Sequence, residues 1–364
     1  MFLVDENAGA TLSYEDLIKL INEGKRGLHY LCDFVTDILT HSDVNLSSYI
    51  PSGSKVSTPI INKADLLLRF KQSKSNVILS TSGTTGKPKD IKHPISHLLR
   101  NVRESLHPAV WALAYNSKHM GGLQVILQAV SNGNTLVNVY DQKREFIFNQ
   151  IVKHNITHIS ATPTFYRLLN CGDQRFEGVK RVTVGGELSQ KSTFDLLNKL
   201  FPQAITNNIY ATTETGAILF SKNEIFRLNK KTKIVKDTLH VKSDSGRWAD
   251  TGDKVEREPN DSSYFRFVGR NYEIINVGGN NVNPHEVEEI LRSHPHIKDA
   301  VVYGRASSVL GSLVVCDIIP VINDIKHNDV IKFLKGKGLE NFKIPRFFKC
   351  VHQLNVSPNL KTIR

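Results

Sequence analysis

The sequence predicts an α/β protein with a large N-terminal domain, whose mostly parallel sheet is flanked by helices, and a small α+β C-terminal domain. Three observations predict this fold. Strand-like and helix-like runs alternate between Asn134 and Tyr210, as they do in βαβ units. The apolar strands of this region end in polar or glycine-rich turns, which is typical of a sheet that binds ligands at its strand ends. The chain of 364 residues is long enough for a large core and a smaller second one.

The composition and net charge of the chain indicate which kinds of molecule it could bind. Hydrophobic residues make up 40% and charged residues 23% of the chain, and the formal net charge is +12. The first two values are typical of a soluble globular protein. The basic residues are dispersed, with the densest cluster at Lys230–Lys233. Dispersed positive charge favours a nucleotide, coenzyme A or an acidic carrier protein as partner, and without a nucleic-acid-binding motif we expect no nucleic-acid partner.

The spacing of the cysteines and the composition of the first residues indicate the cellular compartment of the protein. The cysteines Cys32, Cys171, Cys316 and Cys350 are far apart, so they form no zinc spacing and no redox pair. The segment Met1–Glu6 lacks a basic region followed by an apolar core, and no apolar run reaches the length of a membrane span. We therefore expect a cytoplasmic protein with no signal peptide and no membrane span.

Capping residues and apolar runs predict the secondary-structure elements that precede the candidate site in the sequence. Ser13 can cap a helix with apolar positions over Leu17–Ile21, and Gly24 can end it. A variable stretch to about Asn62 follows, with a loop at 51–54. The apolar run Val77–Leu79 predicts a buried strand.

A loop rich in glycine, hydroxyl and lysine side chains follows that strand. Glycines allow backbone N–H groups to approach an anion, hydroxyls donate hydrogen bonds and lysines supply charge, so such a loop is suited to polyphosphate. It is not a Walker A loop, since its glycines are only three positions apart and Pro88 follows Lys87. The candidate residues are Thr81, Ser82, Gly83, Thr84, Thr85, Gly86 and Lys87.

The alternation that defines the large sheet comes next. Pro94 is expected to open a helix that continues to Leu106. The alternating strands and helices are Thr135–Val139, Arg144–Val152, Ile156–Ala161, Thr164–Leu169, Val179–Val184, Thr193–Phe201 and Ile205–Tyr210. Three polar turns follow strands, at Ala161–Thr164, Gly185–Glu187 and Tyr210–Gly216. Any one of them is an ordinary turn, but three at strand carboxyl ends predict a site.

The C-terminal part has its own pattern. Pro284 opens a helix, and the remaining expected elements are Ala300–Tyr303, Leu313–Ile319, Val330–Leu334 and Phe347–Val351.

In their order these motifs resemble the adenylate-forming superfamily of acyl-CoA synthetases, peptide-synthetase adenylation domains and luciferases. The resemblance covers Asn76 to Arg364 and implies an AMP-binding domain at 1–271 and a small mobile domain at 272–364. Residues 1–75 match poorly and imply a shortened N-terminal part. The outer wall of the acyl pocket and the oligomeric state therefore stay open, with a homodimer as one alternative.

The resemblance also implies roles for residues. Lys361, Glu214 and Thr213 would act in catalysis, with Glu214 holding Mg²⁺. The nucleotide would be bound by the loop residues above and by Gly186, Glu187, Tyr210, Ala211, Thr212, Asp253 and Arg270. The carboxylate substrate would lie near His119, Gly121, Thr162 and Gly185, and the thiol would approach Gly278 and Gly279.

The implied activity is the ATP-dependent conversion of a small carboxylic acid to an acyl-adenylate, followed by transfer to coenzyme A. No acidic residue occurs between Trp111 and Val125, which favours an acid without an α-amino group. Two alternatives stay open. One is loading of a carrier-protein phosphopantetheine. The other is a non-catalytic nucleotide-binding homologue, suggested by the departures Tyr272, Asn276 and Leu360 from the family pattern.

Overall fold

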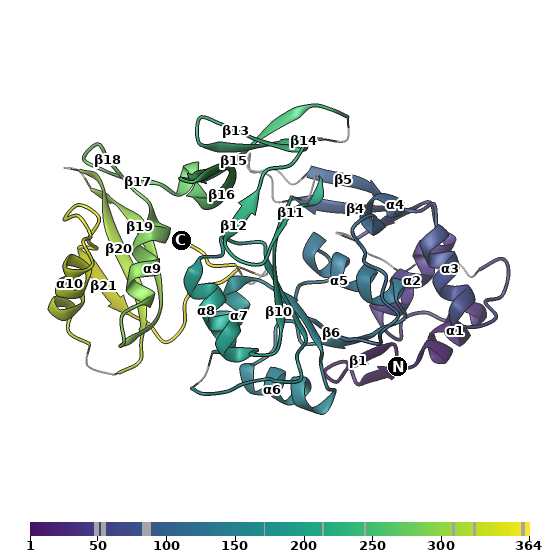
Figure 1. The fold of residues 1–364 in the computed structure, drawn as a ribbon. Coiled ribbons are helices and arrows are strands. Elements are labelled where there is room, and N and C mark those ends of the chain that lie inside the picture. The colour runs from purple at the N-terminus through teal and green to yellow at the C-terminus, as the bar shows by residue number, and fades with distance from the viewer. Residues whose placement is uncertain are drawn as a thin grey trace.

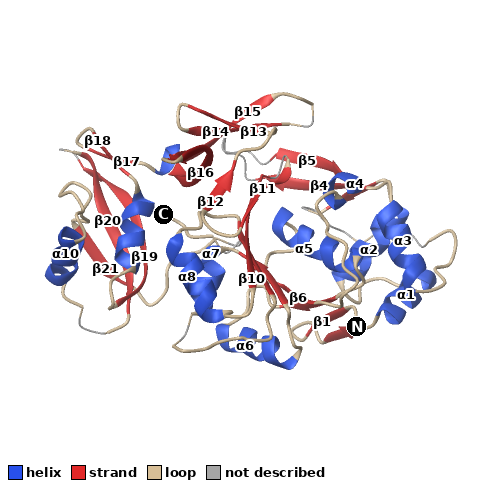
Figure 2. Ribbon diagram, in the orientation of Figure 1, coloured by secondary structure: helices blue, strands red, loops and turns tan. Residues whose placement is uncertain are grey.

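The structure is a computed structural model. It describes residues 1–46, 51, 56–81, 89–170, 172–212, 215–243, 245–307, 310–322, 325–357 and 361–364. Within these ranges no helix is both long enough and apolar enough to cross a membrane. Figure 1 and Figure 2 show a large unit and a smaller one at its side. We call residues 1–271 the large unit and residues 272–364 the cap.

An eight-stranded sheet forms the centre of the large unit, in the order β11-β10-β9-β8-β6-β7-β1-β2. Its interior pairs are parallel, and only the edge strands β2 and β11 run antiparallel. The predicted mostly parallel sheet is therefore confirmed. The strands are β1 Leu3–Asp5, β2 Ala10–Leu12, β6 Val110–Leu113, β7 Thr135–Asn138, β8 His158–Ala161, β9 Arg181–Gly185, β10 Ile205–Thr212 and β11 Gly216–Ser221.

Helices cover both faces of this sheet because successive strand residues point to opposite sides. Leu113 and Leu136 pack into one apolar core with α1, α2, α3 and α5, whereas Ala112 and Val137 pack into another with α6, α7 and α8. The helices are α1 Tyr14–Glu23, α2 Tyr30–Thr40, α3 Lys63–Gln72, α4 Ile95–Leu99, α5 Met120–Ser131, α6 Arg144–Lys153, α7 Pro163–Leu169 and α8 Lys191–Leu200.

The predicted ends of the first helix, at Ser13 and Gly24, are confirmed. The Ser13 hydroxyl accepts from the Asp16 amide and the Asp16 carboxylate accepts from the Ser13 amide, which is a capping box. Gly24 ends the helix with a φ of 69°.

One expectation for the large unit is wrong, since the helix expected from Pro94 to Leu106 ends at Leu99. The variable stretch before Asn62, for which no element was predicted, contains the helix α2. After Leu99 the side chains of α5 bind the backbone instead: Gln128 both accepts from and donates to the main chain of Arg103. These long-range bonds replace the helical ones.

Two smaller sheets complete the large unit. An antiparallel sheet has the order β12-β16-β15-β14-β13, and a three-stranded one has the order β3-β4-β5. The predicted strand at Val77–Leu79 is the buried centre of β4. The strands are β3 Asp43–Asn45, β4 Asn76–Thr81, β5 Lys89–Pro94, β12 Ile225–Arg227, β13 Thr232–Val235, β14 Thr238–Lys242, β15 Trp248–Glu258 and β16 Asp261–Arg270.

A 3-10 turn at Asn271–Glu273 connects β16 of the large unit to β17 of the cap. The cap sheet has the order β18-β17-β20-β19, with β21 paired in parallel to β20. Its elements are β17 Ile275–Val277, β18 Asn280–Val282, α9 Pro284–Arg292, β19 Ile297–Ser307, β20 Gly311–Pro320, α10 His327–Gly336 and β21 Phe347–Cys350. The predicted α+β arrangement of this part is confirmed. Figure 1 shows that the chain then returns toward the large unit, so that the C-terminal end lies between the cap and α7 and α8.

Candidate active site

The carboxyl ends of the parallel strands bring several predicted residues to one edge of the large sheet. Thr162 follows β8, Gly185 ends β9 and Glu187 lies two residues beyond it. Thr162 is buried, and its hydroxyl caps α7 by accepting from the Phe165 amide at 3.1 Å. The structure thus gives Thr162 a local role at the position where the resemblance implies a substrate contact.

Gly185 and Gly186 allow close approach at this edge. A Cβ on Gly185 would lie 2.7 Å from the carbonyl oxygen of Ile209 on β10, so a side chain there would push the two strands apart. Gly186 has a φ of 83°, which L-residues rarely adopt. A Cβ on Gly186 would lie 3.7 Å from Cε of Lys361. The backbone of this turn therefore adjoins the side chain of a residue from the far end of the chain.

Lys361 lies among charged groups of the predicted nucleotide site. The residue keeps exposed surface, yet the protein around its ammonium lowers its pKa by desolvation. The Arg270 guanidinium lowers this pKa further, whereas Glu187 and Asp253 oppose the change. Lys361 in turn contributes, after burial, to the lowered pKa of His119. The charge of Lys361 thus acts on His119, and the charges of Arg270, Glu187 and Asp253 act on Lys361.

Tyr210, Asp253 and Arg270 form a hydrogen-bonded group across β10, β15 and β16. The Tyr210 hydroxyl donates to Oδ2 of Asp253 at 2.6 Å, and Nε of Arg270 donates to Oδ1 at 2.8 Å. Burial, and then the Asp253 carboxylate, raise the pKa of Tyr210. The Tyr210 ring stacks on Phe267 with centroids 4.6 Å apart. Since a carboxylate has about four acceptor positions, Asp253 can still accept from a vicinal diol.

Glu187 binds main-chain amides rather than facing an open space. Its Oε2 accepts from the Thr164 amide at 3.0 Å, and its Oε1 accepts from the Thr362 amide at 2.6 Å. The resemblance implies a residue beside adenine, but the structure uses this carboxylate to join the start of α7 to the C-terminal segment. Thr362 directly follows Lys361, so Glu187 fixes the backbone next to the lysine.

His119 and Gly121 lie at the start of α5. His119 is the N-cap residue of that helix and its side chain makes no capping hydrogen bond. A Cβ on Gly121 would lie 3.2 Å from the Tyr115 ring, whose hydroxyl donates to the Gly185 carbonyl at 3.3 Å. Tyr115 thus joins the two glycines predicted to line the substrate pocket. It was missed in the sequence, although it comes soon after the apolar strand β6.

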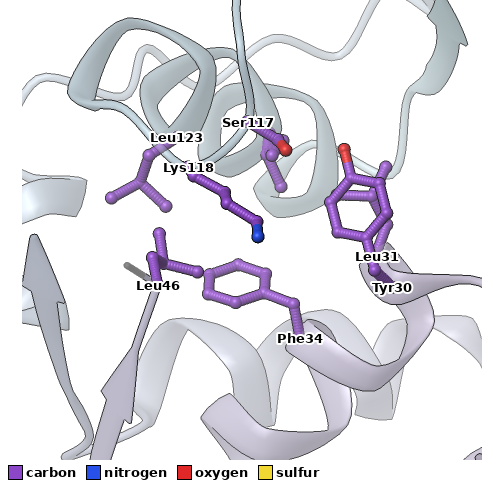
Figure 3. A pocket seen from close by; sticks show the side chains of 8 residues that line it. Tyr30, Leu31, Phe34, Leu46, Ser117, Lys118 and Leu123 are labelled. Carbon is purple, nitrogen blue, oxygen red and sulfur yellow. The ribbon is translucent and has the colours of Figure 1, made fainter. Parts of the chain in front are cut away.

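A small, mostly apolar cavity lies beside the segment that leads to His119 (Figure 3). It is lined by Tyr30, Leu31, Phe34, Leu46, Ser117, Lys118, Leu123 and Ile126. Figure 3 shows the Lys118 side chain extending into this cavity, above the Phe34 ring. The cavity lies where α2 and the end of β3 pack against α5, and we assign it to the packing that supports the Ser117–His119 backbone.

The other predicted nucleotide residues are placed as follows. Ala211 and Thr212 end β10, and the Thr212 hydroxyl shares a hydrogen bond of 2.8 Å with Thr215. Ser82 to Lys87, Thr213 and Glu214 lie outside the described residues, as does the Thr81 side chain. In the described part of the chain no group of three or more His, Cys, Asp or Glu side chains could hold a metal ion. A Mg²⁺ ion held by one carboxylate and phosphate oxygens needs no such group.

Gly278 and Gly279 form the turn between β17 and β18, with φ values of 57° and 88°. The Asn276 side chain accepts from the Gly279 amide at 2.9 Å. Asn276, a departure from the family pattern, therefore stabilises this turn. Tyr272, the other departure near the connection to the cap, is 68% exposed and its hydroxyl accepts from Arg270.

Arg364 fixes the C-terminal segment to the cap. It donates to Glu273 at 3.1 Å and to Glu288 at 3.0 Å, and Glu288 is almost fully buried. The chain that follows Lys361 is thus held at two points, by Thr362 at the large unit and by Arg364 at the cap.

Comparison with known proteins gives matches over most of the chain. The model of the family described as AMP-binding enzyme matches residues 54–242, and that of the AMP-binding enzyme C-terminal domain matches residues 286–361. A 2-succinylbenzoate–CoA ligase of Staphylococcus epidermidis (strain ATCC 12228) is 25% identical over 76% of this chain and 66% of its own length. An uncharacterized acyl–CoA ligase YtcI of Bacillus subtilis is 22% identical over 88% of this chain and 69% of its own length. The chain therefore spans about two thirds of the length of these relatives.

Solved structures share the fold. The o-succinylbenzoate CoA synthetase (MenE) of Bacillus subtilis, in complex with the acyl-adenylate intermediate OSB-AMP, aligns with a TM-score of 0.70 and 18% identity. The alignment covers 99% of this chain and 93% of that one. ATP-bound MatB of Rhodopseudomonas palustris aligns with a TM-score of 0.62 and 18% identity over 81% of this chain and 70% of that one.

Proposed function

The chain belongs to the AMP-binding enzyme family, and from this premise we propose that it is an acid–thiol ligase. It activates a small carboxylic acid with ATP and transfers the acyl group to coenzyme A. In the first step a carboxylate oxygen attacks the α-phosphorus of ATP, and the bond to pyrophosphate breaks. In the second step the thiol sulfur attacks the acyl carbon, AMP leaves with the electron pair of the broken C–O bond, and the thiol proton passes to solvent.

One observation carries the proposal: Lys361, from the end of the chain, lies against Gly186 at the strand ends. There Arg270 and Asp253 influence its pKa, and it influences the pKa of His119. A carboxylate and a phosphate meeting there would place negative charge beside its ammonium. A preorganised cation stabilises charge that develops in the transition state. Lys361 is therefore the residue that we assign to the first step.

The remaining residues position the nucleotide. Asp253 would accept from the ribose hydroxyls, Arg270 would add positive charge, and the Tyr210 ring would lie along the base. The loop Thr81–Lys87 would bind the polyphosphate through its amides and Lys87. Mg²⁺ held by Glu214 would neutralise charge on the phosphate oxygens, and the Thr213 hydroxyl would donate a hydrogen bond to them. Catalysis by these groups is mainly positioning and charge neutralisation.

The substrate pocket is formed from His119, Gly121, Tyr115 and Gly185. In this reading the cap then rotates about Asn271–Glu273, so that the Gly278–Gly279 turn takes part in thiol transfer. The relatives named for 2-succinylbenzoate suggest an acid without an amino group, in line with the segment around His119.

The test is acid-dependent exchange of pyrophosphate into ATP, across a panel of short, aromatic and dicarboxylic acids that includes 2-succinylbenzoate. Lys361→Ala should lower the exchange rate by about 10² or more. Lys343→Ala removes a cap lysine that is paired with Glu286 and should leave the rate unchanged. Unchanged exchange in Lys361→Ala would contradict the assignment.

The thiol acceptor is identified separately. With an active acid, product analysis in the presence of coenzyme A should show the acyl-CoA thioester. Accumulation of acyl-adenylate with coenzyme A, but acyl transfer to a phosphopantetheinylated carrier protein, would show the carrier to be the acceptor instead.

A further inference from the structure

A single guanidinium joins three parts of the molecule at the interface between the cap and the large unit. Arg167 of α7 donates from Nε to Oδ2 of Asp299 on β19 at 3.0 Å. From one terminal nitrogen it donates to the Thr362 hydroxyl at 3.1 Å and to the Thr164 hydroxyl at 2.7 Å. Arg167 therefore contacts the cap sheet and the C-terminal segment at the same time.

The Asp299 carboxylate is shared by two arginines from different units. Arg292 of α9, within the cap, donates from Nε to Oδ1 at 2.8 Å. Burial alone would raise the pKa of Asp299, but Arg167 and Arg292 outweigh it and lower that pKa. The side chains of Arg167 and Asp299 are 14% and 10% exposed. If the cap moved away, Asp299 would lose Arg167 and keep Arg292.

The contact to Thr362 links this pair to Lys361. The Thr362 hydroxyl lies 3.0 Å from that of Thr164, and its amide donates to Glu187. The side chain of Thr362 is thus bound at the start of α7, and its main chain is bound to Glu187 in the turn after β9. A residue bound so closely restricts the Lys361 backbone next to it. Arg167 is the positively charged group among the partners of Thr362 named here, and Glu187 is the negatively charged one.

We propose that Arg167 is a positioning residue for Lys361, and that its contact with Asp299 is an ionic contact that must break when the cap is released. This inference rests on the proposed function. While Arg167 holds Asp299 and Thr362, Lys361 is fixed at the strand ends and the first step is favoured. Breaking the contact returns Arg167 to water and leaves Asp299 paired with Arg292, so release exposes no unpaired carboxylate.

The alternative is an ion pair that only stabilises the fold. A buried pair is weak evidence for stability, since desolvation of both charges offsets their attraction. A purely structural pair would affect both steps of the reaction equally when removed, whereas a positioning residue affects the step that needs Lys361. Separate measurement of the two steps therefore decides between them.

The first experiment needs no substrate. Hydrogen–deuterium exchange of the free protein is followed in peptides that contain the Thr164 and Thr362 amides, for the wild type, Arg167→Met and Arg167→Lys. The amides should exchange at least 10-fold faster in Arg167→Met. Arg167→Lys should restore part of the protection, because lysine can pair with Asp299 but cannot also hold both hydroxyls in the same fixed geometry. Lys343→Met, which removes a cap ion pair away from these contacts, is the matched control.

The second experiment separates the two steps. Arg167→Met should lower acid-dependent pyrophosphate exchange about 10-fold through kcat, with little change in the KM for ATP, because Asp253 and Arg270 are untouched. Conversion of supplied acyl-adenylate to thioester should be unchanged or faster. An equal loss in both steps, or unchanged amide protection, would overturn the proposal. If the wild type shows no exchange with any acid, the proposed function fails, whereas amide protection still decides whether Arg167 holds the C-terminal segment.

Discussion

The interior of the cap and the surface by which the cap contacts the large unit are built from different side chains. Inside, Val287, Leu291 and Val302 belong to one apolar cluster and are fully buried. At the interface the contacts are polar: Gln190 donates to the His285 carbonyl, and the Ser192 amide donates to Glu289. Water can replace polar contacts of this kind, whereas exposed apolar surface is costly. The comparison teaches that the fold of the cap depends on its own apolar core, whereas its contact with the large unit includes polar groups that water can replace.

The largest expected effect is in the cap interior. Leu291→Ala removes a fully buried side chain and should lower the free energy of unfolding of the cap by about 2–5 kcal/mol. Trp111 and Trp248 are the two tryptophans of the chain, and both lie in the large unit. Hydrogen exchange in α9 and β19 should therefore report the loss while the urea midpoint of tryptophan fluorescence stays unchanged. An equal shift in fluorescence would mean that the two units unfold together and would break the comparison.

An intermediate effect is expected for the C-terminal anchor. Arg364→Gln removes the contacts to Glu273 and Glu288, and should lower cap stability by about 1–2 kcal/mol because Glu288 is buried and keeps only its other partners. Exchange at residues 361–364 should rise with it. Lys343→Met removes partly exposed pairs and should cost no more than about 1 kcal/mol. An equal loss of cap stability in Arg364→Gln and Lys343→Met would show that the ion pairs of Arg364 contribute no more than ordinary surface ion pairs.

The smallest expected effect is the dependence of the free energy of unfolding on pH that arises from Asp299. The folded protein holds the pKa of Asp299 below its ordinary value of 3.8, so the carboxylate contributes stability that is fully present above that value. This contribution is lost as the pH falls through the lower, folded pKa. Between pH 6 and pH 2.5 the wild type should lose more stability than Asp299→Asn, as measured by urea unfolding at each pH. Parallel pH profiles for the two proteins would argue against ionic contacts at this interface.

Much of the fold could be predicted because its signals are local. Alternating runs with turns at their ends predicted β7 to β10, and Ser13 and Gly24 predicted the ends of α1. The helix α2 was missed because most of its residues, including Asp33 and Asp37, are buried, so it shows little of the one-sided pattern of a surface helix.

The residues of the candidate site likewise fall into those that motifs identify and those that only the folded chain reveals. Lys361, Asp253 and Arg270 were named from motifs; in the structure Arg270 donates to Asp253, and Lys361 lies against Gly186. Arg167 and Asp299 lie 132 positions apart and belong to no motif, so only the folded chain could reveal their contact. The role of Glu187 could not be predicted either, because its partners are main-chain amides, which leave no trace in the sequence.

The double pairing of Asp299 has a consequence for energetics. If the cap moves as proposed, Arg292 accompanies this carboxylate, and arginine stays charged throughout the physiological range, so neither charge needs to gain or lose a proton. Movement of the cap at neutral pH should then be proton-neutral at this contact. The heat of that movement would be the same in buffers with very different enthalpies of ionisation.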